Sequence, residues 1–129
     1  MYYEIGSTSH ELTADDLRKG LFSAFEQQKF INKVLAIPPD YTRFPSRAGE
    51  LTEMTWEYYG DKLTDVLPAL GTHSPMTPKQ IAHMFGRLPA SLIREHDWRH
   101  DVVTVGEVPG EYVKQVSEGA VDFAGPAQV

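Results

Sequence analysis

Hydrophobic residues recur at helical spacing in three stretches of the chain, residues 13–25, 46–60 and 77–86. Thr13 precedes two aspartates, a combination that caps a helix and suits the positive end of its dipole. Pro78 stands at the first position of the third stretch, where proline is favoured. The second and third stretches each end at a glycine, the residue that most often stops a helix. The pattern therefore predicts three helices.

Short, continuous apolar runs alternate with these helices. In chain order they are residues 34–37, 63–70 and 102–105. Such runs are typical of strands that are buried on both faces, although Pro68 marks an edge or a bulge within the second. A short helix over 111–118 and an edge segment over 121–123 follow. The alternation predicts one α/β domain over residues 1–129, Rossmann-like, with a mainly parallel sheet and helices on both faces.

Composition narrows the possible functions. The 129 residues are 41% hydrophobic and 23% charged, which suits a globular domain with a core. The net charge of −6 gives no electrostatic support for binding nucleic acid. The absence of cysteine excludes disulfides, thiolate nucleophiles and thiolate metal sites. The N-terminus does not resemble a signal peptide and no run is long enough for a membrane span, so we expect a cytoplasmic protein without a membrane partner.

Two loops that follow the first two strands carry the candidate functional side chains. The loops are PPDYTRFPSR, residues 38–47, and GTHSPMT, residues 71–77. Their reactive or charged residues are Asp40, Thr42, Arg43 and His73. In a parallel sheet both loops leave at the edge where ligands bind, so these side chains are expected to converge. A guanidinium captures carboxylate or phosphate, an imidazole is the usual general acid or base, and the helix after residue 77 offers free amides to an anion.

Each of these residues also has a purely structural interpretation. A single histidine after a glycine is more often a loop residue than a catalyst. Asp40 is equally suited to forming a turn, and Arg43 to a solvated surface. His96 and His100 have the i, i+4 spacing of a metal pair, but the strand expected from residue 102 leaves no room for the helix that such a pair needs. No metal site is therefore expected.

The two loop motifs closely resemble the N-terminal part of the lactate racemase family. The resemblance runs from about residue 34 to residue 129 and includes the segment EHDWRHDVVTVGEVP. Members of this family racemise or epimerise 2-hydroxy acids with a nickel-pincer nucleotide and have two α/β domains with the site between them. The resemblance implies that Asp40, Thr42 and Arg43 bind substrate or cofactor. It also implies that His73 is one of two acid–base histidines.

This chain matches only about the first third of a family member. The second catalytic histidine, the lysine that carries the cofactor and the nickel-ligating histidine are expected further along a longer polypeptide. The fragment alone is therefore expected to be inactive and to need the rest of that polypeptide as a partner, or to form a homodimer through exposed apolar surface. Ser74 stands where lactate-specific members often have a basic residue, which points away from lactate as the 2-hydroxy acid. The alternative is a stand-alone anion-binding or interaction module that uses the same loops without catalysis.

Overall fold

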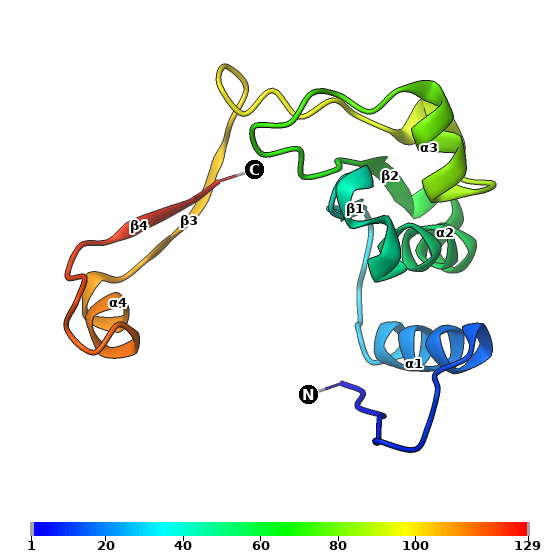
Figure 1. Cartoon of the computed structure of the whole chain (residues 1–129), viewed down its shortest axis with the longest axis horizontal. Helices are drawn as coiled ribbons and strands as arrows, with labels where there is room; N and C mark the ends of the chain where they lie inside the picture. The colour runs from blue at the N-terminus through cyan, green and yellow to red at the C-terminus, as the bar shows by residue number, and fades with distance from the viewer. Residues whose placement is uncertain (1, 129) are drawn as a thin grey trace. The chain divides into compact units, whose positions relative to one another are not determined.

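The computed structural model of the protein describes residues 2–128 (Figure 1). Contacts divide the chain into two compact units, one that extends to His96 and one that starts at Asp97. The expectation of a single domain over residues 1–129 stays a prediction, and each unit is described by itself. Within residues 2–128, no helix combines the length and apolar character that a membrane crossing requires.

The first unit contains three α-helices, as the pattern predicts. They are α1 (Ala14–Glu26), α2 (Ala48–Tyr59) and α3 (Pro78–Phe85). Thr13 caps α1 and Thr77 caps α3, each through a capping box in which the third helical residue bonds back to the cap. The second helix begins two residues later than expected, because Tyr41–Ser46 forms a 3-10 helix, η1, and Arg47 follows with a left-handed φ of 61°.

The two first strands form a small parallel sheet, which gives a mixed α/β fold. Strand β1 (Val34–Ala36) pairs with β2 (Leu63–Val66). The parallel pairing reaches beyond both strands, since the amide of Ala69 donates to the carbonyl of Pro38 at 2.8 Å. A third segment joins β2 on its other side, where the amide of Arg94 donates to the carbonyl of Val66 at 2.8 Å. The second apolar run is thus a strand only in its first half.

The expected third strand is part of the second unit and does not pair with β1 or β2. β3 (Thr104–Val108) pairs antiparallel with β4 (Gly125–Gln128), and α4 (Gly110–Val116) lies between them in sequence. The prediction that residues 102–105 extend the parallel sheet is therefore wrong, as is the edge segment over 121–123. A segment with high β-propensity can pair with any strand that is nearby in space. Here β3 pairs with β4, which follows it closely in sequence.

The core of the first unit lies between the sheet and the helices. Its buried members are Leu63, Val66, Met84, Phe85 and Leu88. The backbones of α2 and α3 approach so closely that a Cβ atom at Gly49 would lie 2.0 Å from the carbonyl oxygen of Met84. Only glycine fits there.

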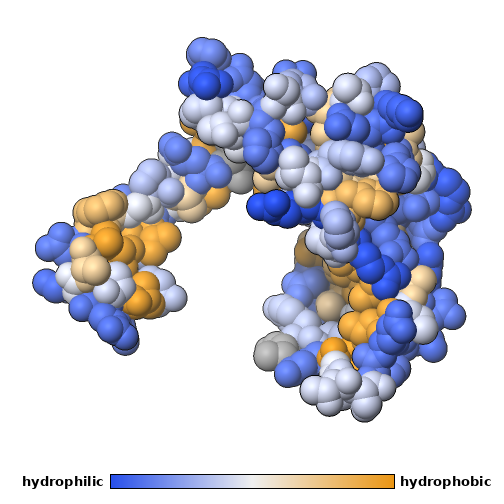
Figure 2. All heavy atoms as spheres, in the orientation of Figure 1, coloured by the Kyte–Doolittle hydropathy of each residue, from blue (hydrophilic) through white to orange (hydrophobic). Residues whose placement is uncertain are grey.

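Helices were expected on both faces of the sheet, but one face of β1 is left partly exposed. Leu35 and Ile37 leave 47% and 48% of their surface exposed. None of the described residues of the second unit is buried. Figure 2 shows hydrophobic side chains at the surface of that unit. Both units thus present apolar surface to solvent.

Candidate functional site

The two candidate loops leave the parallel sheet at the same edge, as predicted. Asp40 follows directly after Pro39, which forms a parallel bridge with Ala69. After Ala69 the chain turns sharply, and the amide of His73 donates to the carbonyl of Leu70 at 3.0 Å. The turn needs a glycine because Gly71 has a φ of 55°, a conformation that other residues adopt only with strain. The loops thereby bring Asp40 and His73 together.

Asp40 and His73 form a hydrogen-bonded pair. The Nδ1 atom of His73 lies 2.7 Å from Oδ2 of Asp40. An ionised carboxylate only accepts hydrogen bonds, so Nδ1 carries the proton. In the neutral imidazole the lone pair is then on Nε2, on a side chain that is 54% exposed, whereas that of Asp40 is only 7% exposed. The arrangement is that of an oriented general base with a buried carboxylate behind it.

Thr42 holds the same carboxylate from its other side. Oδ1 of Asp40 accepts hydrogen bonds from the hydroxyl of Thr42 at 2.5 Å and from its amide at 3.2 Å. Burial acts to raise the pKa of Asp40, but the hydrogen bonds from Thr42 and His73 outweigh it, and the pKa lies below its ordinary value. Asp40 therefore stays ionised at neutral pH and caps η1 at the same time.

Arg43 lies in η1 next to Thr42, and its amide donates to the carbonyl of Asp40 at 3.0 Å. In the described part of the chain, its guanidinium makes no hydrogen bond to Asp40 or His73. Its side chain is exposed. Within residues 2–128 it makes no ion pair, unlike Arg18, Arg47, Arg87 and Arg94. The structure thus brings together three of the four expected residues. The fourth residue, Arg43, directly follows Thr42, and its positive charge has no partner among the residues that the structure describes.

A further group fixes η1 against α3 and was not expected from the sequence. The hydroxyl of Tyr41 lies 2.7 Å from Nδ1 of His83, and the ring of Phe44 stacks on the same imidazole at 4.5 Å. Tyr41 and His83 are 42 residues apart, so no local pattern signals this contact. The contact positions the segment that carries Thr42 and Arg43.

His96 and His100, the pair with metal-like spacing, have different surroundings. His100 pairs with Asp97, with 3.0 Å between Nδ1 and Oδ2, in an exposed i, i+3 arrangement. Nδ1 of His96 is buried and has no hydrogen-bond partner in the described part of the chain. Within residues 2–128, no three side chains of histidine, aspartate or glutamate gather where they could hold a metal ion.

One solved structure has a similar fold. It is the crystal structure of a protein from Thermotoga maritima, a Northeast Structural Genomics Consortium target, with a TM-score of 0.60 and 24% sequence identity. The similarity covers 92% of this chain and 30% of that protein, so the present chain spans less than a third of its length. At this identity the likeness shows the fold alone. No family model matches the chain, and no curated protein matches it either.

Proposed function

We propose that this chain carries an acid–base and anion-binding site of an enzyme that racemises or epimerises 2-hydroxy acids, as in the lactate racemase family. The observation that carries the proposal is the 2.7 Å hydrogen bond between His73 and Asp40. It lies at the carboxyl ends of parallel strands, where α/β proteins bind their ligands. We propose in addition that the small sheet belongs to a Rossmann-like N-terminal domain of a longer, cytoplasmic protein.

His73 is the catalytic base of the proposed reaction. For one enantiomer, Nε2 would accept the proton of the substrate's hydroxyl group, and a bound nucleotide cofactor would supply the acceptor for the C2 hydride. The keto acid formed is planar, and inversion would require that its oxygen is protonated from the other side and that the cofactor gives the hydride back to the opposite face. The hydroxyl proton lies on opposite sides in the two enantiomers, so one imidazole serves one of them and a second base serves the other. Asp40 is the positioning residue, because its carboxylate fixes the tautomer of His73 and stabilises the imidazolium.

Arg43 is suited to hold the anionic end of the substrate or cofactor. The hydroxyl and the amide of Thr42, which was also expected to bind there, both donate to Asp40 and leave no free donor. A guanidinium without an internal partner forms paired hydrogen bonds with a carboxylate or a phosphate. In the proposed enzyme a nickel-pincer nucleotide supplies the hydride acceptor when it is bound. The donor set of this chain fits the anionic groups of such a nucleotide. By the resemblance to the lactate racemase family, we propose that the nickel ligand and the attachment lysine lie further along a longer polypeptide.

The test is the activity of the complete, cofactor-loaded protein after substitution of His73. We expect His73→Ala to reduce racemisation of its 2-hydroxy acid by about 10²–10⁴-fold, the usual contribution of a general base. In a single turnover, hydride transfer from one enantiomer should fall far more than from the other. Arg43→Ala should weaken both enantiomers alike, because the carboxylate is common to them.

His100→Ala is the matched control, since His100 also pairs with an aspartate through Nδ1. It should leave turnover unchanged. If His73→Ala retained racemisation within about threefold of the unsubstituted protein, His73 would not be the base. Loss of anion binding in Arg43→Ala together with such unchanged turnover would instead support the binding module without catalysis. The free charge of Arg43 is the observation that favours this second function.

A further inference from the structure

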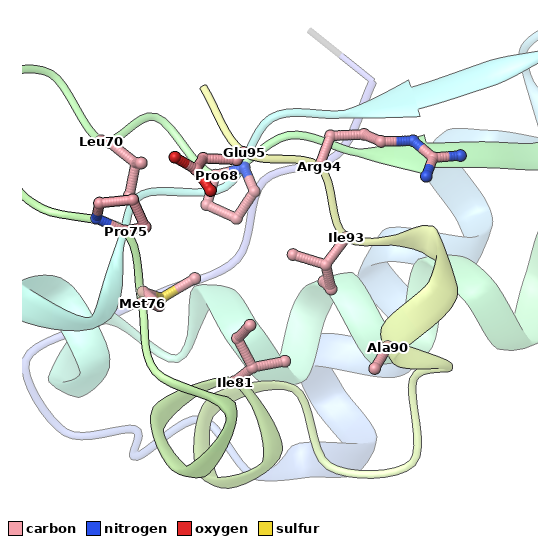
Figure 3. A pocket seen from close by; sticks show the side chains of 9 residues that line it. All are labelled: Pro68, Leu70, Pro75, Met76, Ile81, Ala90, Ile93, Arg94 and Glu95. Carbon is pink, nitrogen blue, oxygen red and sulfur yellow. The ribbon is translucent and has the colours of Figure 1, made fainter. Parts of the chain in front are cut away.

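A small cavity lies beside the turn that carries His73, within the first unit. It measures about 170 Å³. Its walls come from the end of the second apolar run, the turn, α3, the 3-10 helix η3 (Ala90–Leu92) and the third parallel segment. The lining residues that Figure 3 labels include Leu70, Pro75, Met76, Ile81, Ile93 and Glu95. The proposed reaction at His73 makes no use of this cavity.

Most of the residues that line the cavity are apolar, although polar and apolar atoms contribute about equally to its exposed surface, and its size is suited to one small apolar group with a polar end. Proline, leucine, isoleucine and methionine side chains surround the space (Figure 3). A dry protein cavity of about 150 Å³ is large enough to bind benzene. This cavity therefore has room for one aromatic ring or a short branched alkyl group. Met76 adds a flexible, polarisable wall that adapts to either.

Two charged residues line the cavity, and only one of them is free. The guanidinium of Arg94 points away and donates to Oδ1 of Asp65 at 2.6 Å (Figure 3). The carboxylate of Glu95 extends toward Leu70 and Pro75 instead. In the part of the chain that the structure describes, Glu95 makes no ion pair, whereas Glu50, Glu53 and Glu57 each pair with an arginine.

We propose that this cavity binds a small hydrophobic amine in its cationic form. The apolar group fills the space between Met76, Ile81 and Ile93, and the ammonium pairs with Glu95. Apolar side chains beside one unpaired carboxylate favour this chemistry, because a neutral ligand leaves the charge unmatched and an anion is repelled. For the same reason the cavity is unsuited to the carboxylate of a 2-hydroxy acid. The site is distinct from the one around His73, and the proposal does not depend on the proposed reaction.

The probe is benzylammonium, titrated into the protein labelled with ¹³C at the methionine methyl groups. Met76 reports on the cavity, while the buried Met54 and Met84 serve as internal references. We expect a saturable shift of the Met76 methyl signal and about two- to fivefold tighter binding than for benzyl alcohol, which is the range of an exposed ion pair. Benzoate should bind more weakly than benzyl alcohol.

Two variants make the result decisive. Glu95→Gln should abolish the preference for benzylammonium but retain the binding of benzyl alcohol. Ala90→Phe, at an exposed position on the cavity wall, should fill the space and abolish the binding of both. Circular dichroism checks that each variant is folded. The proposal is overturned if the Met76 signal shows no saturable shift, or if Glu95→Gln keeps the same preference for the cation.

Discussion

Nδ1 of His73 lies 2.7 Å from Oδ2 of Asp40, although 33 positions separate the two residues in sequence. The contact exists because two parallel strands end side by side and each is followed at once by a tight turn. It gives His73 a fixed orientation and leaves Nε2 on the exposed side. The contact has consequences that can be measured without any enzymatic assay.

The tautomer of His73 is the most direct consequence. Because the ionised carboxylate of Asp40 accepts from Nδ1, the neutral imidazole should carry its proton on Nδ1 and a lone pair on Nε2. ¹⁵N chemical shifts of the histidine ring distinguish the two nitrogens. Asp40→Asn should relax this preference, because an amide can either donate or accept. A protonated Nε2 in the neutral ring of the unsubstituted protein would contradict the arrangement.

Removal of the Asp40 carboxylate should also destabilise the first unit. The carboxylate caps η1 and accepts hydrogen bonds from Thr42 and His73 while nearly buried. Loss of such bonds to a charged group costs about 1.5–3 kcal/mol in the free energy of unfolding. We expect a loss in this range for Asp40→Ala in urea unfolding. Asp65→Ala is the control and should cost about 1 kcal/mol or less, because its pair with Arg94 is exposed.

The contribution of Asp40 to stability should depend on pH with a definite sign. The pKa of Asp40 is lowered in the folded protein from an ordinary value of 3.8. A lowered pKa means that the stabilisation is present above that ordinary value and is lost as the pH falls through the folded value. The difference in unfolding free energy between the unsubstituted protein and Asp40→Asn should therefore be larger at about pH 7 than at about pH 3. A difference that grew on acidification would show that the carboxylate is not stabilised in its charged form.

Gly49 should resist substitution because of the close approach of α2 and α3. A Cβ atom there would lie 2.0 Å from the backbone oxygen of Met84, which cannot move without shifting the helix. We expect Gly49→Ala to cost about 1–3 kcal/mol, as overpacking usually does, even though alanine favours helix formation. Gly20→Ala is the control. The three atoms nearest to a Cβ there all belong to the ring of Tyr3, whose side chain can rotate away, so the effect should be within about 1 kcal/mol.

The uncovered face of β1 should promote self-association. Parallel sheets are normally covered on both faces, and Leu35 and Ile37 are each about half exposed. Sedimentation velocity should show a concentration-dependent dimer that the double substitution Leu35→Thr and Ile37→Thr weakens. Val116→Thr, at an exposed apolar position of the second unit, should leave the association unchanged. A monomer at all concentrations would contradict this prediction.

The local sequence determined the three helices of the first unit, most of their ends, and the presence of the first two strands. Thr13 and Thr77 cap helices because a hydroxyl and a residue three positions later satisfy free amides within one turn, which needs no distant partner. Gly60 and Gly86 end helices because they adopt φ values of 53° and 57° without a steric cost. The apolar runs at residues 34–37 and 63–66 predicted strands because continuous burial leaves the same pattern wherever the strand pairs.

The tertiary structure alone decided which strands pair and which side chains meet. The run at residues 102–105 has the same local character as the first two, yet β3 pairs antiparallel with β4, because pairing depends on the strand that is nearby in space. The segment at Ile93 and Arg94 joins β2 in parallel without an apolar run that signals it. The sequence placed Asp40 and His73 at one edge. Their hydrogen bond and the anchoring of Tyr41 on His83 join residues that are 33 and 42 positions apart, so only the pairing of β1 with β2 and the packing of η1 against α3 set these distances. The support from Thr42 is local, since it lies two positions from Asp40.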